Sequence, residues 1–157
     1  MSELSNFTYD EISIGQTAEY SKQIGEQDIQ LFAAVSGDVN PLHLDAEFAA
    51  TTPFKERIAH GMLTGAIISA ALALELPGPG TVYLGQTLRF RLPVKIGDQI
   101  TVKLEVTEKR DDKGFVTLDC KALNQAGKTV ATGVAEVMAP REKMRLPQPQ
   151  LPPIRVG

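Results

Sequence analysis

The sequence has no tryptophan, only one cysteine, and few aromatic residues, which make up 6% of its 157 positions. A single cysteine excludes a disulfide bond within the chain and a cysteine-rich zinc site. Neither sign of charge is in clear excess, because 16 Lys and Arg residues stand against 19 Asp and Glu residues, for a net charge of −3. Proteins that bind nucleic acid usually carry a basic surface, so the composition argues against a nucleic-acid partner.

Long apolar runs are missing as well. The opening segment MSELSNFTYDEIS has no basic start followed by an apolar stretch, so it does not resemble a secretory signal peptide. The longest uncharged apolar stretch, Ile58–Leu74, is interrupted by His60 and by several Gly, Thr and Ser residues. A membrane-spanning helix needs about 20 mainly apolar residues, and this stretch is too short and too polar. We therefore expect a cytoplasmic protein with no membrane partner.

What is present is the composition of an ordinary globular domain, 43% hydrophobic and 22% charged. In the second half of the chain, apolar and polar residues alternate, most clearly in Ile100–Thr107 and Val116–Ala122. This period of two predicts strands with one buried face, joined by turns at Asp111–Gly114 and Gln125–Gly127. Further strands are expected at 17–24, 87–92 and 130–138, the last with an uncertain register because Gly133 interrupts its pattern.

The first half of the chain is predicted to be helical or irregular. Residues Glu26–Ser36 form an amphipathic pattern that ends at Gly37, and Asp45 can cap a short helix that follows. The segment Gly61–Leu76 has no charge before Glu75 and is apolar all round, which indicates a helix buried on nearly every side. We expect an antiparallel sheet that wraps around this helix.

No repeat with a period of about 20–50 residues is visible, so we expect a single domain. The chain after Ala139 holds five of the ten prolines, which favour an extended arm over a packed core. The predicted organisation is therefore one folded domain over residues 1–139, followed by a proline-rich extension over residues 140–157.

Acid, amide and imidazole groups are collected in the segment Ser36–Asp45. Pro41 disfavours a helical conformation at Asn40, so the segment is expected to be a bent loop between two helices. Such a bend can bring Asp38 and His43 to one water molecule, from which they could take one proton and deliver another elsewhere. Asn40 would orient that water or hold the loop. A structural alternative stays open, because Asp38 and Asn40 are common turn formers and His43 could be a packed histidine.

The start of the predicted buried helix, Ala59-His60-Gly61-Met62, is the second candidate for chemistry. The first turn of a helix leaves backbone N–H groups unpaired. A substrate oxygen that gains negative charge would satisfy them, and Gly61 would let it approach closely, whereas His60 is expected to contact the loop. Met62, Ser69 and Leu72 share one helix face and could line a substrate tunnel, although Ser69 could instead bond a backbone carbonyl one turn earlier.

The run Gly37-Asp38-Val39-Asn40-Pro41-Leu42-His43-Leu44-Asp45, followed by Phe48-Ala49 and by His60-Gly61-Met62, resembles the hydratase 2 motif of MaoC-like hot-dog proteins. Within that family the pattern is most similar to the (R)-specific enoyl-CoA hydratases of the PhaJ type, over about residues 8–139. The resemblance implies an α+β hot-dog fold, in which an antiparallel β-sheet wraps around a long central helix. It also implies a homodimer with a continuous sheet and an acyl-CoA substrate.

The resemblance implies an activity and the roles of individual residues as well. The enzyme would add water across trans-2-enoyl-CoA to give (R)-3-hydroxyacyl-CoA, without a metal or other cofactor, and would supply polyhydroxyalkanoate synthesis from β-oxidation. The matching positions are the catalytic pair Asp38 and His43, the supporting amide Asn40, the backbone donor Gly61, and Ser69 near the tunnel. Which member of the pair protonates C2 is left open.

Two other functions remain open from the sequence. A hot-dog thioesterase would bind the same acyl-CoA and direct water to the carbonyl carbon, and a non-catalytic acyl-CoA-binding subunit would keep the fold without turnover. Thioesterases and acyl-carrier dehydratases of this fold often place a carboxylate on the central helix, and Gly61–Leu74 contains no Asp or Glu. This absence favours the hydratase.

Overall fold

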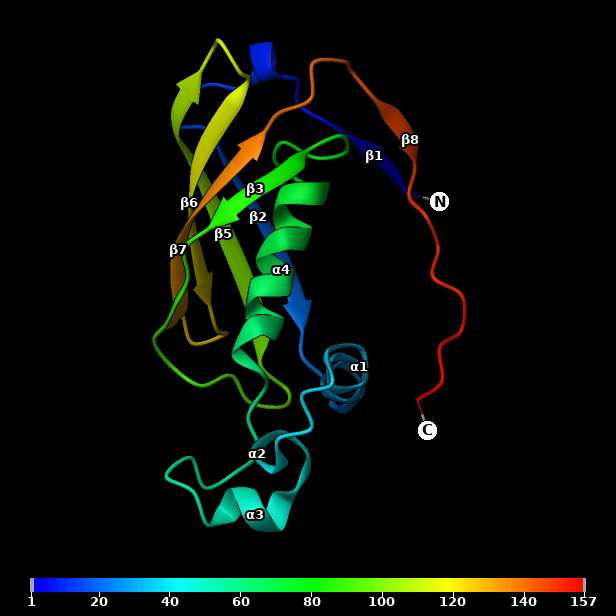
Figure 1. Ribbon diagram of the computed structural model, residues 1–157, viewed down its shortest axis with the longest axis vertical. Helices are drawn as coiled ribbons and strands as arrows, with labels where there is room; N and C mark the ends of the chain where they lie inside the picture. Colours follow the sequence, from blue (N-terminus) through cyan, green and yellow to red (C-terminus); the bar gives the residue numbers. More distant parts are fainter. Residues whose placement is uncertain (1, 157) are drawn as a thin grey trace.

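One long helix, α4 (Gly61–Leu74), lies along an antiparallel sheet in the computed structural model, which describes residues 2–156 (Figure 1). The sheet has the strand order β2-β5-β6-β7-β3, and β4 also pairs with β7. The bounds of these strands are Thr17–Gln23 for β2, Val82–Gln86 for β3, Arg89–Phe90 for β4, Gln99–Arg110 for β5, Phe115–Leu123 for β6 and Thr129–Met138 for β7. This is the α+β arrangement that the sequence predicts.

The alternating pattern of β5 and β6 explains how the sheet packs on α4. Their apolar residues point to the same face and are buried in one core with the inner side of the helix, whereas the polar residues between them are more exposed. The predicted turns are confirmed, because Gly114 and Gly127 end them with φ values of +71° and +75°, a region that favours glycine.

The register of β7, uncertain from the sequence, depends on Gly133. A Cβ placed at Gly133 would lie 2.0 Å from the backbone oxygen of Thr87, in the short connection between β3 and β4. Gly133 therefore leaves room for the backbone of Thr87 to lie close against β7. Gly133 itself pairs with Cys120 of the neighbouring strand β6. The strand expected over residues 87–92 is shorter in the structure, where only β4 has regular strand pairing. Thr87 instead donates its N–H to the Val134 oxygen and accepts the Val134 N–H with its hydroxyl, outside the regular ladder.

Three short helices of the first half gather at the N-terminal end of α4 (Figure 1). Helix α1 (Glu26–Ser36) ends at Gly37, whose φ of +80° is left-handed, as predicted. Helix α3 (Ala46–Ala50) is capped by Asp45, also as predicted. The expectation of a bent loop throughout 36–45 is wrong in one part, because Pro41–Leu44 forms one turn of helix, α2. Proline is well suited to the first position of a helix, which explains the difference.

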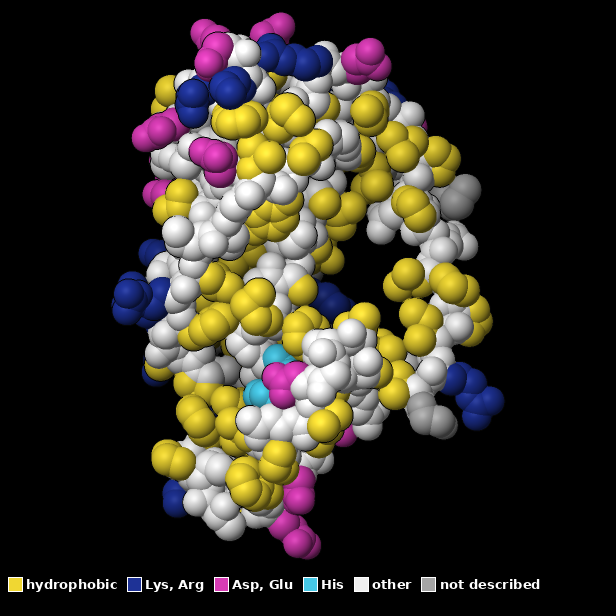
Figure 2. Space-filling model, in the orientation of Figure 1, with side chains coloured by type: hydrophobic (Ala, Val, Ile, Leu, Met, Phe, Trp, Pro, Cys, Tyr) yellow, Lys and Arg dark blue, Asp and Glu magenta, His cyan; other side chains and the backbone are white. Residues whose placement is uncertain are grey.

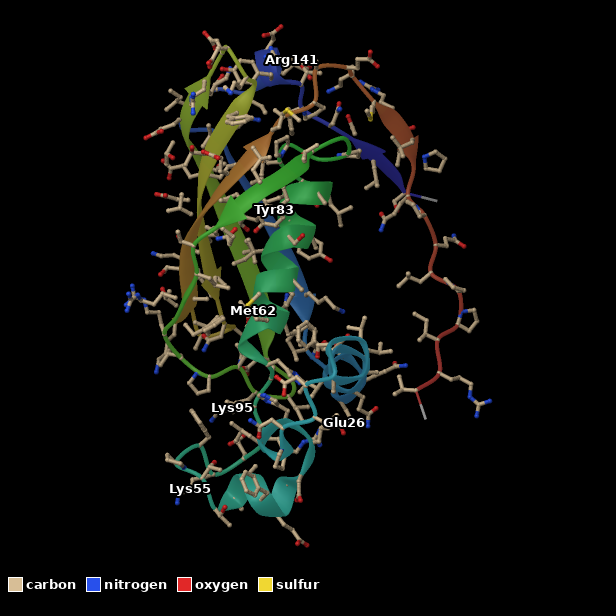
Figure 3. All side chains as sticks on the ribbon, in the orientation of Figure 1. Glu26, Lys55, Met62, Tyr83, Lys95 and Arg141 are labelled. Atoms are coloured by element: carbon tan, nitrogen blue, oxygen red, sulfur yellow. The ribbon has the colours of Figure 1, made fainter. Side chains whose placement is uncertain are left out.

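Helix α4 is not buried on every side of this single chain, contrary to the sequence prediction. Its inner residues Ile68 and Ala71 are fully buried, but Met62 is 59% exposed, and Ala66 and Ala73 are exposed on the same face. The sheet covers one side of the helix, and no other element within residues 2–156 covers this second face. Figure 3 marks Met62 near the N-terminal end of α4. None of the described helices is long and apolar enough to cross a membrane.

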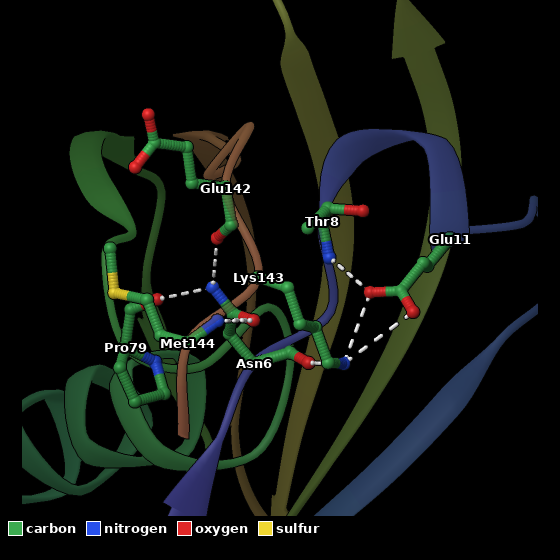
Figure 4. Close-up of polar contacts among 7 residues, drawn as sticks. All are labelled: Asn6, Thr8, Glu11, Pro79, Glu142, Lys143 and Met144. Atoms are coloured by element: carbon green, nitrogen blue, oxygen red, sulfur yellow. Dashed lines mark hydrogen bonds and ion pairs between the residues drawn. The ribbon is translucent and has the colours of Figure 1, made fainter. Parts of the chain in front are cut away.

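A small second sheet joins the start of the chain to a late segment, since β1 (Glu3–Ser5) pairs with β8 (Arg145–Pro147). The one-turn helix η1 (Tyr9–Glu11) follows β1. The Asn6 side chain, which is buried, donates to the backbone oxygens of Pro79 and Glu142 and accepts from the Met144 N–H (Figure 4). Residues 140–147 are thus bonded to the folded body.

Residues 148–156 form an extended arm without helix or strand. Figure 2 shows an opening between this arm and the body of the molecule. The arm returns to the body at its tip, where Ile154 and Val156 lie across an apolar pocket from Phe32 and Val35 of α1. The arm expected from the proline content covers residues 140–157, but residues 145–147 form β8, so the extended part without strand begins only at residue 148.

Candidate active site

The candidate residues converge where α1, α2 and α4 meet. Asp38 follows α1, His43 lies on α2, and His60 immediately precedes α4. One side-chain nitrogen or carboxylate oxygen from each of these three residues lies within 4.8 Å of the others. Figure 2 shows both histidines of the chain beside an acidic side chain. The predicted meeting of an acid and an imidazole is therefore present.

His43 is held in a defined orientation. Its side chain is 8% exposed, and its Nδ1 lies 2.8 Å from the backbone oxygen of Ile58. Because a carbonyl oxygen only accepts, Nδ1 carries the proton in this bond, and in the neutral ring Nε2 then has the lone pair. No hydrogen bond to a described residue involves Nε2. His43 is thus packed, as the structural alternative requires, but it also keeps one nitrogen available for a proton.

Asp38 combines a turn contact with an exposed carboxylate. Its Oδ1 accepts a hydrogen bond from the Asn40 N–H at 3.2 Å, which is the turn contact that its residue type favours. The residue is exposed, so the rest of the carboxylate faces the space beside His43. The turn and the acid are therefore compatible roles of one side chain.

The Asn40 side chain bonds the backbone of its own loop. Its side-chain oxygen accepts from the Leu42 N–H at 3.1 Å and caps α2. This bond stabilises the helix that carries His43, since an N-cap satisfies a backbone donor without an intrahelical partner. Of the two roles expected for Asn40, the structure displays the one that holds the loop.

The first turn of α4 presents free backbone donors. Within residues 2–156, the N–H groups of Gly61 and Met62 have no acceptor, and the first bonded N–H of the helix is that of Leu63 to the His60 oxygen. A pocket of about 320 Å³ opens at this point, lined by His60, Gly61, Thr64 and Phe90 among others. The predicted backbone donor thus borders a cavity in which an anionic oxygen would be stabilised.

The helix face expected to line a tunnel is only partly accessible. Met62 is exposed and Ser69 is half-buried, whereas Leu72 is 1% exposed and belongs to the core. The Ser69 hydroxyl makes no hydrogen bond to any described residue, so the alternative of a bond to a carbonyl one turn earlier is not what the structure has. In the single chain, Leu72 packs in the core beside Ile68 and Ala71.

Sequence reasoning missed the aromatic residues around this site. Phe32 of α1 packs on the His60 ring with centroids 4.9 Å apart, and the Phe90 ring covers Gly61. The helical period of α1 indicates that Phe32 is buried, but nothing in the sequence indicates that it contacts a histidine 28 positions away. The role expected for His60, a contact of the loop, is confirmed, because its Nε2 lies 2.9 Å from the Asp38 backbone oxygen.

The three clustered side chains do not have the geometry of a metal site. His43 and His60 stack with centroids 3.9 Å apart and planes inclined by 28°. A metal ion would have to lie in the plane of each ring, at about 2.0–2.1 Å from each nitrogen. Two nearly parallel planes do not meet so close to the rings, so the nitrogens cannot converge on one ion.

A sheet packed along one central helix defines the hot-dog fold, and here an acid and an imidazole lie at the N-terminus of that helix. The sequence matches the MaoC-like domain over residues 10–126, and the chain belongs to that family. The R-hydratase PhaJ1 from Pseudomonas aeruginosa is a similar solved structure, 60% identical, with a TM-score of 0.95 over 99% of this chain and all of that one.

Two further relatives are similar over most of their length. The (R)-hydratase from A. caviae involved in PHA biosynthesis is 47% identical, with a TM-score of 0.79 over 82% of this chain and 98% of its own. The (R)-specific enoyl-CoA hydratase of Rhodospirillum rubrum is 48% identical over 84% of this chain and 91% of its own. The family expected from the sequence motif is therefore confirmed.

Proposed function

We propose that this protein is an (R)-specific enoyl-CoA hydratase, a hydro-lyase that adds water to trans-2-enoyl-CoA and forms (R)-3-hydroxyacyl-CoA. The observation that carries the proposal is the position of Asp38 and His43 beside the free N–H groups of α4. The hydratase names of relatives at 47–60% identity support the same activity. The reaction needs water and an acyl-CoA, and the chemistry of these residues requires no cofactor.

The mechanism follows from where charge develops. Conjugation with the thioester carbonyl makes C3 of the substrate electrophilic, and attack by water moves negative charge onto the carbonyl oxygen. The Gly61 N–H is a donor fixed at the positive end of α4, and it would stabilise that charge. A preorganised donor of this kind contributes about 3–4 kcal/mol to lowering a barrier.

The acid and the imidazole divide the proton transfers between them. Asp38 takes a proton from the attacking water, and His43, whose Nδ1 is occupied by the Ile58 carbonyl, uses Nε2 to hold the same water. C2 then receives a proton from this pair, from the same side on which the water was held. Because C3 is the carbon that becomes a stereocentre, attack of the held water on one face of C3 is what makes the product the (R) isomer.

The substrate is proposed to enter at the pocket beside Gly61, with its thioester over the first turn of α4. Asn40 supports the loop beneath it, and Met62, Ser69 and Leu72 are proposed to line the path of the acyl chain. For Leu72 to do so, the core around it must open or a second subunit must complete the tunnel, because the side chain is buried in the single chain.

The test is a hydration assay with enoyl-CoA substrates of increasing chain length, read by loss of the conjugated thioester and by chiral analysis of the product. We expect the (R) product and no free CoA thiol. Asp38→Asn and His43→Gln should each lower kcat by about 10²–10⁴-fold, the usual contribution of one acid–base group. Release of free thiol without 3-hydroxyacyl-CoA would establish a thioesterase instead, and binding without turnover would establish an acyl-CoA-binding subunit.

The active protein is further proposed to be a homodimer. The uncovered face of α4 and the edge strand β3 expose apolar side chains, among them Met62, Val82 and Tyr83. Pairing of two β3 edges would extend the sheet and cover this surface. Ala73→Arg, on the same face but remote from Gly61, should give a monomer in light scattering, whereas an unchanged dimer mass would contradict this interface.

The proposal includes a cellular role, the supply of (R)-3-hydroxyacyl-CoA from β-oxidation to polyhydroxyalkanoate synthesis in the cytoplasm. It is supported by the A. caviae hydratase, which is involved in PHA biosynthesis. Deletion of the gene should lower polymer content in cells grown on fatty acids, and complementation with the Asp38→Asn variant should not restore it.

A further inference from the structure

His60 connects two parts of the active site that are distant in the sequence. It is the last residue before α4, and it is 3% exposed. Its Nε2 lies 2.9 Å from the backbone oxygen of Asp38, so the ring joins the start of the helix to the loop that carries the acid. The Phe32 ring packs against the His60 ring with centroids 4.9 Å apart, and the His43 ring stacks on the His60 ring with centroids 3.9 Å apart.

The hydrogen bonds assign opposite tautomers to the two stacked histidines. The Asp38 carbonyl accepts only, so His60 carries its proton on Nε2, and the Ile58 carbonyl likewise fixes the proton of His43 on Nδ1. Each ring is therefore fixed by a backbone oxygen on one side. For His43 the free nitrogen is Nε2, which takes part in the proposed chemistry, whereas for His60 it is Nδ1, which is buried.

We propose that His60 is a positioning residue of the hydration reaction: its Nε2–H bond to the Asp38 backbone sets the distance between the carboxylate and the donors of α4. This inference rests on the hydratase function proposed above. The water that Asp38 deprotonates must reach C3 while the thioester oxygen lies at Gly61. His60 directly precedes that glycine, and its ring bonds the backbone of Asp38.

The buried Nδ1 of His60 contributes no hydrogen bond to the stability of the fold. Within residues 2–156, it is the buried side-chain nitrogen or oxygen that has no hydrogen-bond partner. An unsatisfied buried polar atom destabilises the folded state, whereas an apolar ring of similar shape would not. A phenylalanine at this position would keep the stack on His43 and remove the unsatisfied atom, but it could not donate to Asp38.

The tautomers can be observed directly, because the chain has only two histidines. Long-range ¹H–¹⁵N correlation spectra of the full-length wild type should show one ring protonated at Nε2 and one at Nδ1. The Nε2–H ring should be the one missing from His60→Phe. Two rings with the same tautomer would overturn the proposed bond, whatever the protein catalyses.

Kinetics then separate positioning from packing through two variants. We expect His60→Phe to lower kcat by about 10²-fold, the effect of misplacing a reacting group by about 1 Å, with little change in KM and no loss of thermal stability. His60→Gln, whose amide nitrogen can replace Nε2 as the donor, should recover most of the lost kcat although it removes the stack.

The results distinguish a positioning role of His60 from a structural role and from failure of the proposed hydratase function. An unchanged kcat in His60→Phe, or an equal loss in His60→Gln, would overturn the positioning role. A loss of kcat that follows a loss of melting temperature in both variants would show a structural role instead. Wild-type protein without hydratase activity would overturn the proposed function, and the tautomer measurement would still decide whether His60 holds the Asp38 loop.

Discussion

The Phe90 ring lies directly over the backbone of Gly61. A Cβ at Gly61 would meet three ring carbons of Phe90 at 2.9–3.1 Å, closer than ordinary contact. Because Gly61 has no side chain, the Phe90 ring can pack against the first turn of α4. The Gly61 N–H then lies at the edge of the pocket that both residues line. Because Phe90 is 50% exposed, its ring can move aside, so sterics and hydrogen bonding at Gly61 can be tested separately.

Gly61→Pro should remove the donor and leave the helix in place. Proline is favoured at the first helical position, and the preceding His60 has φ −58° and ψ 136°, a conformation compatible with a following proline. We expect kcat to fall by about 10²–10³-fold, the effect of losing one donor to a developing oxyanion. Steady-state kinetics and the helical circular dichroism signal measure the two effects.

Gly61→Ala is the matched control, because it adds a Cβ and keeps the N–H. The Phe90 ring must shift, so we expect a higher KM, while kcat stays well above that of Gly61→Pro. When Phe90 is also replaced by Leu, Gly61→Ala should raise KM less, whereas the loss of kcat in Gly61→Pro should stay the same. Equal kcat values for the Pro and Ala variants would show that the N–H of Gly61 does not act on the reacting oxygen.

Substitutions of Asn40 test whether the activity depends on its capping of α2 or on an amide that orients the water. Asn40→Ser keeps an acceptor for the Leu42 N–H, since serine caps helices about as well as asparagine, whereas Asn40→Ala removes it at a cost of about 0.5–2 kcal/mol. We expect the Ser variant to keep most activity and the Ala variant to lose it, as α2 loosens around His43. If both variants lose activity equally, the amide orients the water instead.

Much of the fold could be predicted because local chemistry determines it. The period of two in β5 and β6, the glycine that ends α1 and the Asp45 cap of α3 all act within a few residues, and each is found where the sequence indicates. The pairing of β1 with β8 joins residues more than 130 positions apart, and no local pattern in two three-residue strands indicates it. Long-range pairing of short strands is where sequence patterns carry least information.

The sequence indicates the members of the candidate site but not the contacts that orient them. The loop motif indicated Asp38 and His43, yet the bonds that orient them come from Ile58 and His60, whose positions depend on how α4 packs. The exposed face of α4 was also missed, because a helix that is apolar on all sides indicates burial without indicating what provides it. A second subunit is the cover proposed above.

Cys120 should be unreactive in the folded protein. It is 2% exposed on β6, and burial raises the pKa of its thiol to about 11. Iodoacetamide should modify it slowly at about pH 8 and rapidly after unfolding in urea, because the thiolate is the reactive form. Rapid modification under native conditions would contradict the burial.

The same raised pKa predicts the direction of a pH effect on stability. Because the pKa of the folded thiol is above its ordinary value, its contribution to stability is complete at neutral pH and declines as pH rises past about 9 towards 11. Urea unfolding should therefore show a larger loss of stability between about pH 7 and pH 10 for the wild type than for Cys120→Ala. Equal losses would mean that the thiol has the same pKa in both states.

Truncation of the C-terminal extension should distinguish its two parts. Removal of residues 148–157 takes away the arm, whose hydrogen bonds to the body within residues 148–156 are two exposed ones between Gln148 and Ser2, so we expect little change in the melting temperature. Removal of residues 140–157 also takes away β8, the Pro140 oxygen that accepts from the Tyr9 N–H, and the partners of Asn6. Each buried polar group left unpaired costs about 1–3 kcal/mol, so this shorter chain should be clearly less stable. Equal melting temperatures for both truncated chains would place the end of the folded domain at residue 139, and a loss confined to the second would place it at residue 147.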